Sequence, residues 1–200
     1  DALPILKQVK VSYKFMRSKF FWLMAGVMFF YLCAEATING WLVKYFIDSR
    51  IMTIQYAQVL ASLLWIVMLI GRLTCAFLGD KVSREKLLLT TSIGTVVFYL
   101  LLLSSQNIII ITIAIMGLGF SMAGIYPTTV SSIGSTIKAY PMSMGVLLMI
   151  GGIGAIIMPI ITGALSDAFG ILAGMSAIIF AIILMIVCVV LGVISNKDIV

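Results

Sequence analysis

Long apolar runs, separated by short polar gaps, restrict this chain more than any other feature of its sequence. A membrane-spanning helix needs about twenty largely apolar residues to cross roughly 30 Å of hydrocarbon. Six segments meet this requirement: 20–43, 57–78, 87–103, 108–130, 142–163 and 171–194. Only 10% of the residues are charged, whereas a soluble domain carries about 25%. The sequence therefore predicts an all-α integral membrane protein, a bundle of six transmembrane helices.

The missing residue types exclude several kinds of site. The chain has no histidine, and its three cysteines lie within apolar segments without the spacing of metal ligands. Zinc sites, disulfide frameworks and Cys/His nucleophiles are therefore not supported. An intramembrane protease could instead use paired aspartates, but Asp80 and Asp167 follow spans of opposite direction. We expect no cofactor, no metal and no catalytic residue, so the sequence does not predict an enzyme.

Lysine and arginine are divided unevenly between the two sides that the spans define. Ten of them fall on the side of the termini: Lys7, Lys10, Lys14, Arg17, Lys19, Lys81, Arg84, Lys86, Lys138 and Lys197. The other side has Lys44 and Arg50. Cytoplasmic loops are enriched in lysine and arginine. Both termini are therefore predicted to be cytoplasmic, in a multi-pass protein of the cell membrane. Turn residues support the short connections SSQN (104–107), AYP (139–141) and SDAFG (166–170).

A short motif follows the second span and recurs after the fifth. AFLGDKVS, at 76–83, and GALSDAFG, at 163–170, share the form small-x-Leu-x-Asp-x-x-small. Their aspartates, Asp80 and Asp167, fall on opposite sides of the membrane. Residues 20–103 and 104–200 are therefore predicted to be one three-helix unit used twice in inverted orientation. Secondary transporters use such repeats to build alternating access around a midplane site.

The loop after the second span carries a more specific signal. Gly71-Arg72, followed by Gly79-Asp80-Lys81-x-x-Arg84-x-Lys86, resembles the signature loop of the major facilitator superfamily. It departs from the family pattern at Ala76 and Ser83, where glycine is usual. The resemblance implies half of a twelve-span fold, with residues 1–19 as the remnant of the central cytoplasmic loop. The other half would be a missing N-terminal portion or a second copy of the chain.

The same resemblance implies a gating role for six residues of this loop: Gly71, Arg72, Gly79, Asp80, Lys81 and Arg84. Asp80 would face the positive end of the fifth span, where a carboxylate gains about 0.3–1 kcal/mol, and would hold the cytoplasmic gate shut in one state. Arg72, two turns inside the span, would snorkel to the interface or pair with Asp80. The alternative is a solvated loop that obeys the positive-inside rule. The segment AEATINGWLVKY, at 34–45, is also similar to sugar–proton symporters of the fucose and glucose/galactose type.

The fifth span is rich in glycine and contains a proline. Its members of interest are Gly151, Gly152, Gly154 and Pro159. Membrane helices pack closely through small residues, and this is one interpretation. A kinked helix that moves during transport is the other.

A carboxylate lies deep within the first span. Glu35 follows Phe20 by about 22 Å of helix, and ionisable groups at such depth usually face a cavity or a partner. Asn39, four residues on, shares its helix face. Ser121, Tyr126 and Thr128 of the fourth span lie at a comparable depth. In the family that the chain resembles, the first and fourth spans line the central cavity, so these five residues form the predicted substrate or coupling site.

Three roles for Glu35 stay open at this point. It could be a structural acid that is hydrogen-bonded to a neighbouring helix, a ligand of a polar substrate, or the group that couples transport to protons. Burial in an apolar site disfavours the charged form of a carboxyl group, which suits the third role. The sequence thus predicts half of a secondary active transporter that moves a small polar solute, a sugar-like molecule or another metabolite, across the bilayer by alternating access, coupled to ions or protons. A channel, a structural membrane subunit and a six-span homodimer are the alternatives.

Overall fold

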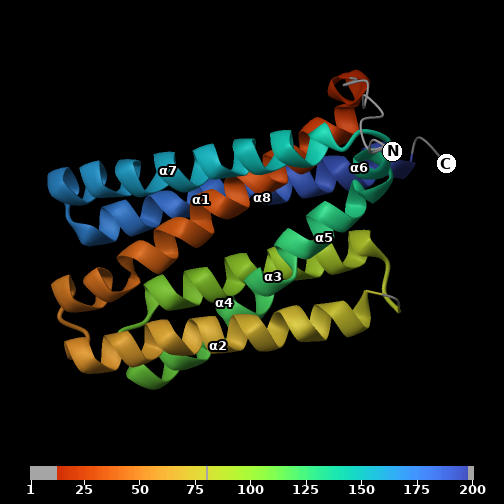
Figure 1. Ribbon diagram of the computed structural model, residues 1–200. Helices are drawn as coiled ribbons and strands as arrows, with labels where there is room; N and C mark the ends of the chain where they lie inside the picture. Colours follow the sequence, from red (N-terminus) through yellow and green to blue (C-terminus); the bar gives the residue numbers. More distant parts are fainter. Residues whose placement is uncertain (1–12, 80, 198–200) are drawn as a thin grey trace, which may run out of the picture.

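The computed structural model of the protein describes residues 13–79 and 81–197, and nearly all of them are helical (Figure 1). The long helices are α1 (Lys19–Asp48), α2 (Ile54–Leu78), α3 (Arg84–Ser104), α4 (Ile108–Ala123), α7 (Met142–Phe169) and α8 (Ile171–Lys197). Three short ones complete the order: η1 (Lys14–Arg17), α5 (Ile125–Ser132) and α6 (Gly134–Ala139). Within the described residues, six helical stretches are long and apolar enough to cross a membrane, with α4 and α5 counted as one. The all-α, six-span fold is confirmed.

The structure corrects the predicted connections in the second half of the chain. The fourth span is not one continuous helix to residue 130, because it breaks at Gly124 and continues as α5 and then α6. Pro127 explains the break, since a proline ring clashes with the carbonyl four residues earlier and is tolerated in a first helical turn. The segment 166–169, predicted as a loop, is the last turn of α7, which ends at Gly170 with φ 89°.

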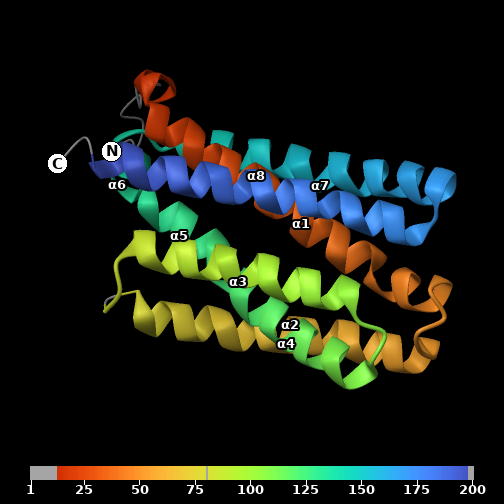
Figure 2. The same cartoon turned by 180° about the vertical axis from the view of Figure 1, so that it is seen from behind.

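The helices exchange partners between the two halves of the chain. The first helix, α1, packs mainly against α7 and α8, whereas α4 packs against α2 and α3. Figures 1 and 2 show the result, with α7, α1, α5 and α2 on one face and α8 and α3 in front on the opposite face. This reciprocal packing is what two inverted units would give if each lent its first helix to the other. The repeat boundaries 20–103 and 104–200 stay a prediction.

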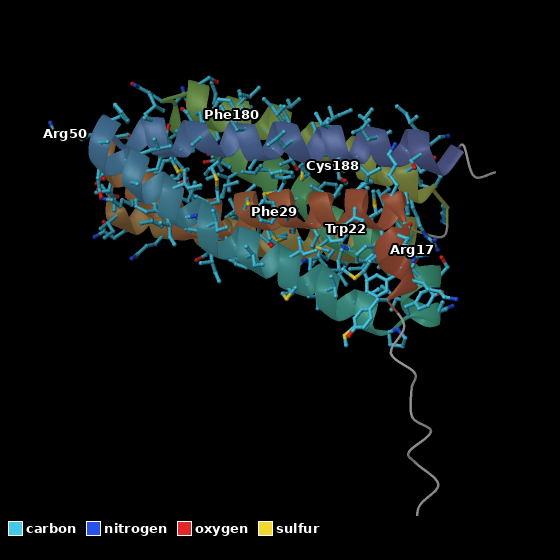
Figure 3. The ribbon with its side chains drawn as sticks, turned by 90° about the horizontal axis from the view of Figure 1, so that it is seen from above. Arg17, Trp22, Phe29, Arg50, Phe180 and Cys188 are labelled. Carbon is cyan, nitrogen blue, oxygen red and sulfur yellow. The ribbon has the colours of Figure 1, made fainter. Side chains whose placement is uncertain are left out.

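Charged residues concentrate at the two ends of the bundle. Arg17 and Arg50 lie at opposite ends (Figure 3). Lys44 and Asp48, near the end of α1, form an exposed ion pair of 2.6 Å. The turn after them places Arg50 at φ 54°, a left-handed conformation that reverses the chain toward α2. The beginning of α1 and the end of α8 lie at the same end (Figure 1), as an even number of spans requires.

The outward surface of the bundle is apolar. Large side chains such as Trp65 on α2, Ile156 on α7 and Phe180 on α8 are more than half exposed. Phe180 stands out at the edge of the bundle in Figure 3. A soluble monomer rarely exposes contiguous apolar surface of this kind, but hydrocarbon is a good solvent for it. The surface composition therefore agrees with a bilayer around the helices.

Candidate functional site

An ion pair between two helices lies at the centre of the candidate site. Arg72 of α2 donates from Nη2 to Oε1 of Glu35 on α1, over 3.4 Å. The Glu35 side chain is only 12% exposed, whereas that of Arg72 is 47% exposed. The same Nη2 atom also contacts the sulfur of Met68 at 3.6 Å. The pair therefore joins an almost buried carboxylate to a guanidinium that opens onto the surface of the bundle.

The tilt of α1 brings these two residues together. Measured from the end of the bundle that they share, Glu35 lies about 24 Å along α1 and Arg72 about 9 Å along α2, at 1.5 Å per residue. Helices perpendicular to the membrane would keep such residues apart. The first helix instead runs obliquely across the bundle (Figure 1), and the long arginine side chain spans the rest. Depth counting alone could not find this pair.

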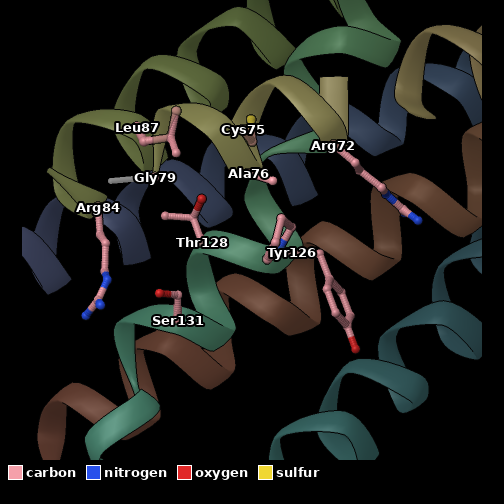
Figure 4. Close-up of a pocket in the computed structure, with 10 residues that line it drawn as sticks. Arg72, Cys75, Ala76, Gly79, Arg84, Leu87, Tyr126, Thr128 and Ser131 are labelled. Carbon is pink, nitrogen blue, oxygen red and sulfur yellow. The ribbon is translucent and has the colours of Figure 1, made fainter. Parts of the chain in front are cut away.

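An open cavity of about 380 Å³ lies next to the ion pair. It is bounded by the C-terminal half of α2, the start of α3 and α5: Arg72, Cys75, Ala76, Gly79, Arg84, Leu87, Tyr126, Pro127, Thr128 and Ser131. Figure 4 shows Arg84 toward one end, Arg72 toward the other, and the Thr128 and Ser131 side chains between the helices. The wall is thus lined by two cationic side chains, three hydroxyl groups and apolar surface.

The break in the fourth span puts hydroxyl groups into this cavity. Gly124 lies at the break, and a Cβ atom there would stand 2.8 Å from both Cys75 Sγ and Thr91 Cγ2. Glycine therefore lets α2 and α3 approach the break closely. The chain then turns into α5, which carries Tyr126 and Thr128 along the cavity wall.

Two further polar groups share the Glu35 face of α1. Tyr31, one turn earlier, is buried, and its hydroxyl interacts electrostatically with Glu35 and Arg72. Asn39, one turn later, has a buried Oδ1 atom. Within the described part of the chain, neither polar atom has a hydrogen bond of standard geometry. Buried polar groups normally find a partner. Tyr31 has Glu35 beside it, so the unused hydrogen-bonding capacity on this face of α1 belongs to Asn39 Oδ1.

The structure brings together most, but not all, of the predicted substrate residues. Tyr126 and Thr128 line the cavity. Glu35 does not line it, but forms an ion pair with Arg72, which does. Asn39 lies on the Glu35 face of α1 but does not line the cavity. Ser121 is buried against α3, where its Oγ would be 2.5 Å from a Cβ on Gly94. Ser121 is not among the residues that line this cavity, and its role in substrate binding stays a prediction.

The residues of the predicted gating motif take different positions. Arg72, Gly79 and Arg84 line the cavity. Gly71 is a packing residue, because a Cβ there would lie 2.6 Å from Ala123 Cβ and 3.0 Å from the Phe120 carbonyl oxygen. Lys81 is exposed in the turn after α2 and donates its backbone N–H to Leu78. Asp80 lies outside the described residues, so its predicted contact with the fifth span stays a prediction, and Arg72 pairs with Glu35.

The glycines of α7 do not all have the same surroundings. A Cβ at Gly154 would lie 2.5 Å from the Phe29 carbonyl oxygen, and one at Gly151 would lie 2.6 Å from Leu32 Cδ1. Close packing against α1 therefore fits both. Gly152 faces open space, with no such contact within 4 Å among the described residues. Pro159 lies inside α7, which continues through it as one helix.

The sequence did not predict that Arg72 is the partner of Glu35, or that two arginines, Arg72 and Arg84, line the cavity. Arg72 and Arg84 were interpreted as loop and gating residues because they belong to a sequence motif there. The signal that could have indicated more was chemical. An arginine two turns inside an apolar span needs a partner, and Glu35 is the acid that the six predicted spans place deepest in the apolar region.

The described residues thus form six apolar helices with exchanged packing, a charged pair between two of them and a partly polar cavity. Residues 15–198 match the model of the Major Facilitator Superfamily, so the chain belongs to this superfamily. That family consists of membrane transporters and is generally non-enzymatic, so the chain is a membrane transport protein. No curated protein matches the chain at a significant level.

Proposed function

We propose that the chain is half of a secondary active transporter, which moves a small polar solute by alternating access. The solute would bind at the cavity between α2, α3 and α5, and Glu35 would couple its movement to protons. The observation that carries this proposal is the Glu35–Arg72 pair, with one partner nearly buried and the other opening into the cavity. Membership of the Major Facilitator Superfamily supports the class of protein.

A purely structural role for Glu35 is less well supported. Removing charges from water costs several kcal/mol per ion, and a buried pair recovers this only with excellent geometry. Here the contact is 3.4 Å long and uses one oxygen of Glu35 and one nitrogen of Arg72. A contact of this geometry holds two helices weakly. It suits a pair that separates and re-forms during a transport cycle.

Glu35→Gln in the full-length protein tests the coupling role. We expect the variant to lose proton-driven accumulation of solute in proteoliposomes while it still exchanges solute across the membrane at zero gradient. The matched control is Asp48→Asn, which removes an exposed carboxylate at the end of α1, and which should leave both activities intact. Unchanged proton-driven accumulation in Glu35→Gln would eliminate the coupling role.

The proposal also includes the surroundings of the chain. The basic end of the bundle, with Lys14, Lys81, Arg84, Lys86 and Lys138, would face the cytoplasm of the cell membrane. A second six-span unit would complete the cavity, either the N-terminal half of a longer protein or another copy. The molecular mass of the full-length protein in mild detergent distinguishes a longer single chain from a pair of copies. Passive ion conductance without saturable uptake would favour the rival function, a channel.

A further inference from the structure

The geometry points to a carboxylate-bearing solute, which binds Arg72 in place of Glu35. This inference rests on the proposed transport function and names the chemical class of its substrate. It follows from three features of the described residues: the N–H donors that Arg72 leaves unused, the composition of the cavity wall, and the position of Glu35 relative to both.

Arg72 has donors to spare. A guanidinium group presents five N–H donors and binds a carboxylate best through two parallel hydrogen bonds. Within the described residues, the contacts of Arg72 to Glu35 and Met68 both leave from Nη2, at 3.4 and 3.6 Å. The side chain is 47% exposed and lines the cavity. A ligand carboxylate in the cavity could therefore form the two parallel hydrogen bonds that Glu35 does not form, and would displace Glu35 from Nη2.

The rest of the cavity wall suits an organic anion. Arg84 adds a second positive charge toward the other end (Figure 4). Tyr126, Thr128 and Ser131 add hydroxyl groups that can donate hydrogen bonds to carboxylate or hydroxyl oxygens. None of the described residues that line the cavity is acidic. A volume of about 380 Å³ limits the occupant to a small molecule.

Glu35 already shows which chemistry Arg72 accepts. Its carboxylate contacts one nitrogen of the guanidinium, and Glu35 itself is not among the residues that line the cavity. A solute carboxylate would compete with it for the same arginine. When the solute carboxylate displaces Glu35 from Arg72, Glu35 loses its partner and faces the buried Tyr31 hydroxyl one turn away on α1. Glu35 is thus an internal competitor, which can be removed separately from the ligand.

The test uses full-length protein in mild detergent, with thermal unfolding as the measure of binding. The probes are acetate, lactate, succinate and adipate, each paired with its neutral amide. We expect at least one carboxylate, and not its amide, to raise the melting temperature in a saturable way. Arg72→Gln should abolish the shift. The matched control, Arg50→Gln, removes an exposed arginine at the opposite end of the bundle and should keep it.

Two more variants give readouts that a structural role would not produce. Arg72→Lys keeps the charge but loses the planar fork, and should bind the carboxylate about tenfold more weakly, a loss of about 1.4 kcal/mol. It also serves if Arg72→Gln does not fold. Glu35→Gln removes the competitor, and because a long contact through one oxygen and one nitrogen is a weak competitor, the variant should bind the carboxylate about two- to fivefold more tightly. Weaker binding in Glu35→Gln would contradict the competition.

The outcomes separate this inference from the proposed function. If no carboxylate stabilises the protein, or if the amides do so equally, the inference is wrong. Saturable uptake of a neutral solute in proteoliposomes would then leave the transport function standing. Conversely, carboxylate binding together with passive conductance and no saturable uptake would overturn the transport function and keep the anion site.

Discussion

Two helix–helix contacts of the bundle, which we call its two walls, are packed in the same way, but the helices that form them differ in shape. The contact of α7 with α1 and the contact of α2 with α4 are equivalent under the predicted inverted repeat. Both depend on glycines that let one backbone approach the other: Gly151 and Gly154 toward α1, and Gly71 and Gly119 between α2 and α4. In lipid, helices associate mainly through such close packing and not through the hydrophobic effect.

The difference lies in the first helix of each unit. The α1 helix runs unbroken through thirty residues and carries Glu35. Its counterpart breaks at Gly124, and the break turns Tyr126 and Thr128 along the cavity. The continuous helix thus supplies the charge and the broken helix supplies the hydroxyl groups. If the predicted repeat holds, the Gly124–Pro127 sequence is the local difference that gives the two first helices different chemistry.

The largest expected effect tests whether the two walls are equally tight. Gly154→Ala would place a methyl group 2.5 Å from the Phe29 carbonyl oxygen, and Gly119→Ala would place one 2.8 Å from that of Leu64. Backbone atoms cannot yield cheaply, so each variant should lose about 2–3 kcal/mol of stability, as overpacking typically costs. Thermal unfolding in detergent measures this.

The control for that experiment lies two residues from Gly154. Gly152→Ala adds a methyl group in open space, and alanine favours a helix over glycine by about 0.5–1 kcal/mol. Its melting temperature should stay the same or rise. A loss as large as that of Gly154→Ala would show that the α1–α7 distance does not decide the result.

A second test compares the two prolines. Pro127→Ala permits α4 and α5 to join into one straight helix, which would turn Tyr126 and Thr128 away from the cavity. Solute binding should weaken about tenfold, equivalent to about 1.4 kcal/mol. Pro159→Ala restores an N–H within the continuous α7 and should raise stability by about 1 kcal/mol, since proline costs up to about 3 kcal/mol in a helix interior. Equal binding in both variants would refute the role of the break.

The smallest expected effect concerns the contact between α3 and α8, behind the two walls. The buried Tyr99 hydroxyl donates to the Met175 carbonyl oxygen over 2.8 Å. Tyr99→Phe should lower stability by about 0.6 kcal/mol, the average for a hydrogen bond between membrane helices. Tyr56→Phe is the matched control, because the Tyr56 hydroxyl is exposed and lies 3.4 Å from Thr112 Oγ1. It should unfold like the unmodified protein, and a larger loss than for Tyr99→Phe would reverse the assignment.

Prediction from the sequence succeeded where one local property, such as the length of an apolar run, decides the structure. The spans follow from apolar length, and Asn107 begins α4 as a turn residue should, with its Oδ1 accepting from the Ile109 N–H at 2.9 Å. Prediction failed where two local signals competed. Pro127 was expected within a continuous span, yet it breaks the helix, whereas Pro159 does not. Depth along the span predicts Ser121 in the site, and the structure places its side chain near Gly94 of α3, a direction that depth alone does not give.

The sequence by itself determined the number of spans, the all-helical class and the superfamily, because hydrocarbon leaves the backbone no alternative to helices. It also determined that an acid and an arginine lie inside the apolar region. Only the tertiary structure decided that Glu35 and Arg72 meet. Their meeting depends on the tilt of α1 and on glycine contacts between helices far apart in sequence. Packing angles of this kind arise from many weak contacts at once, and no single segment encodes them.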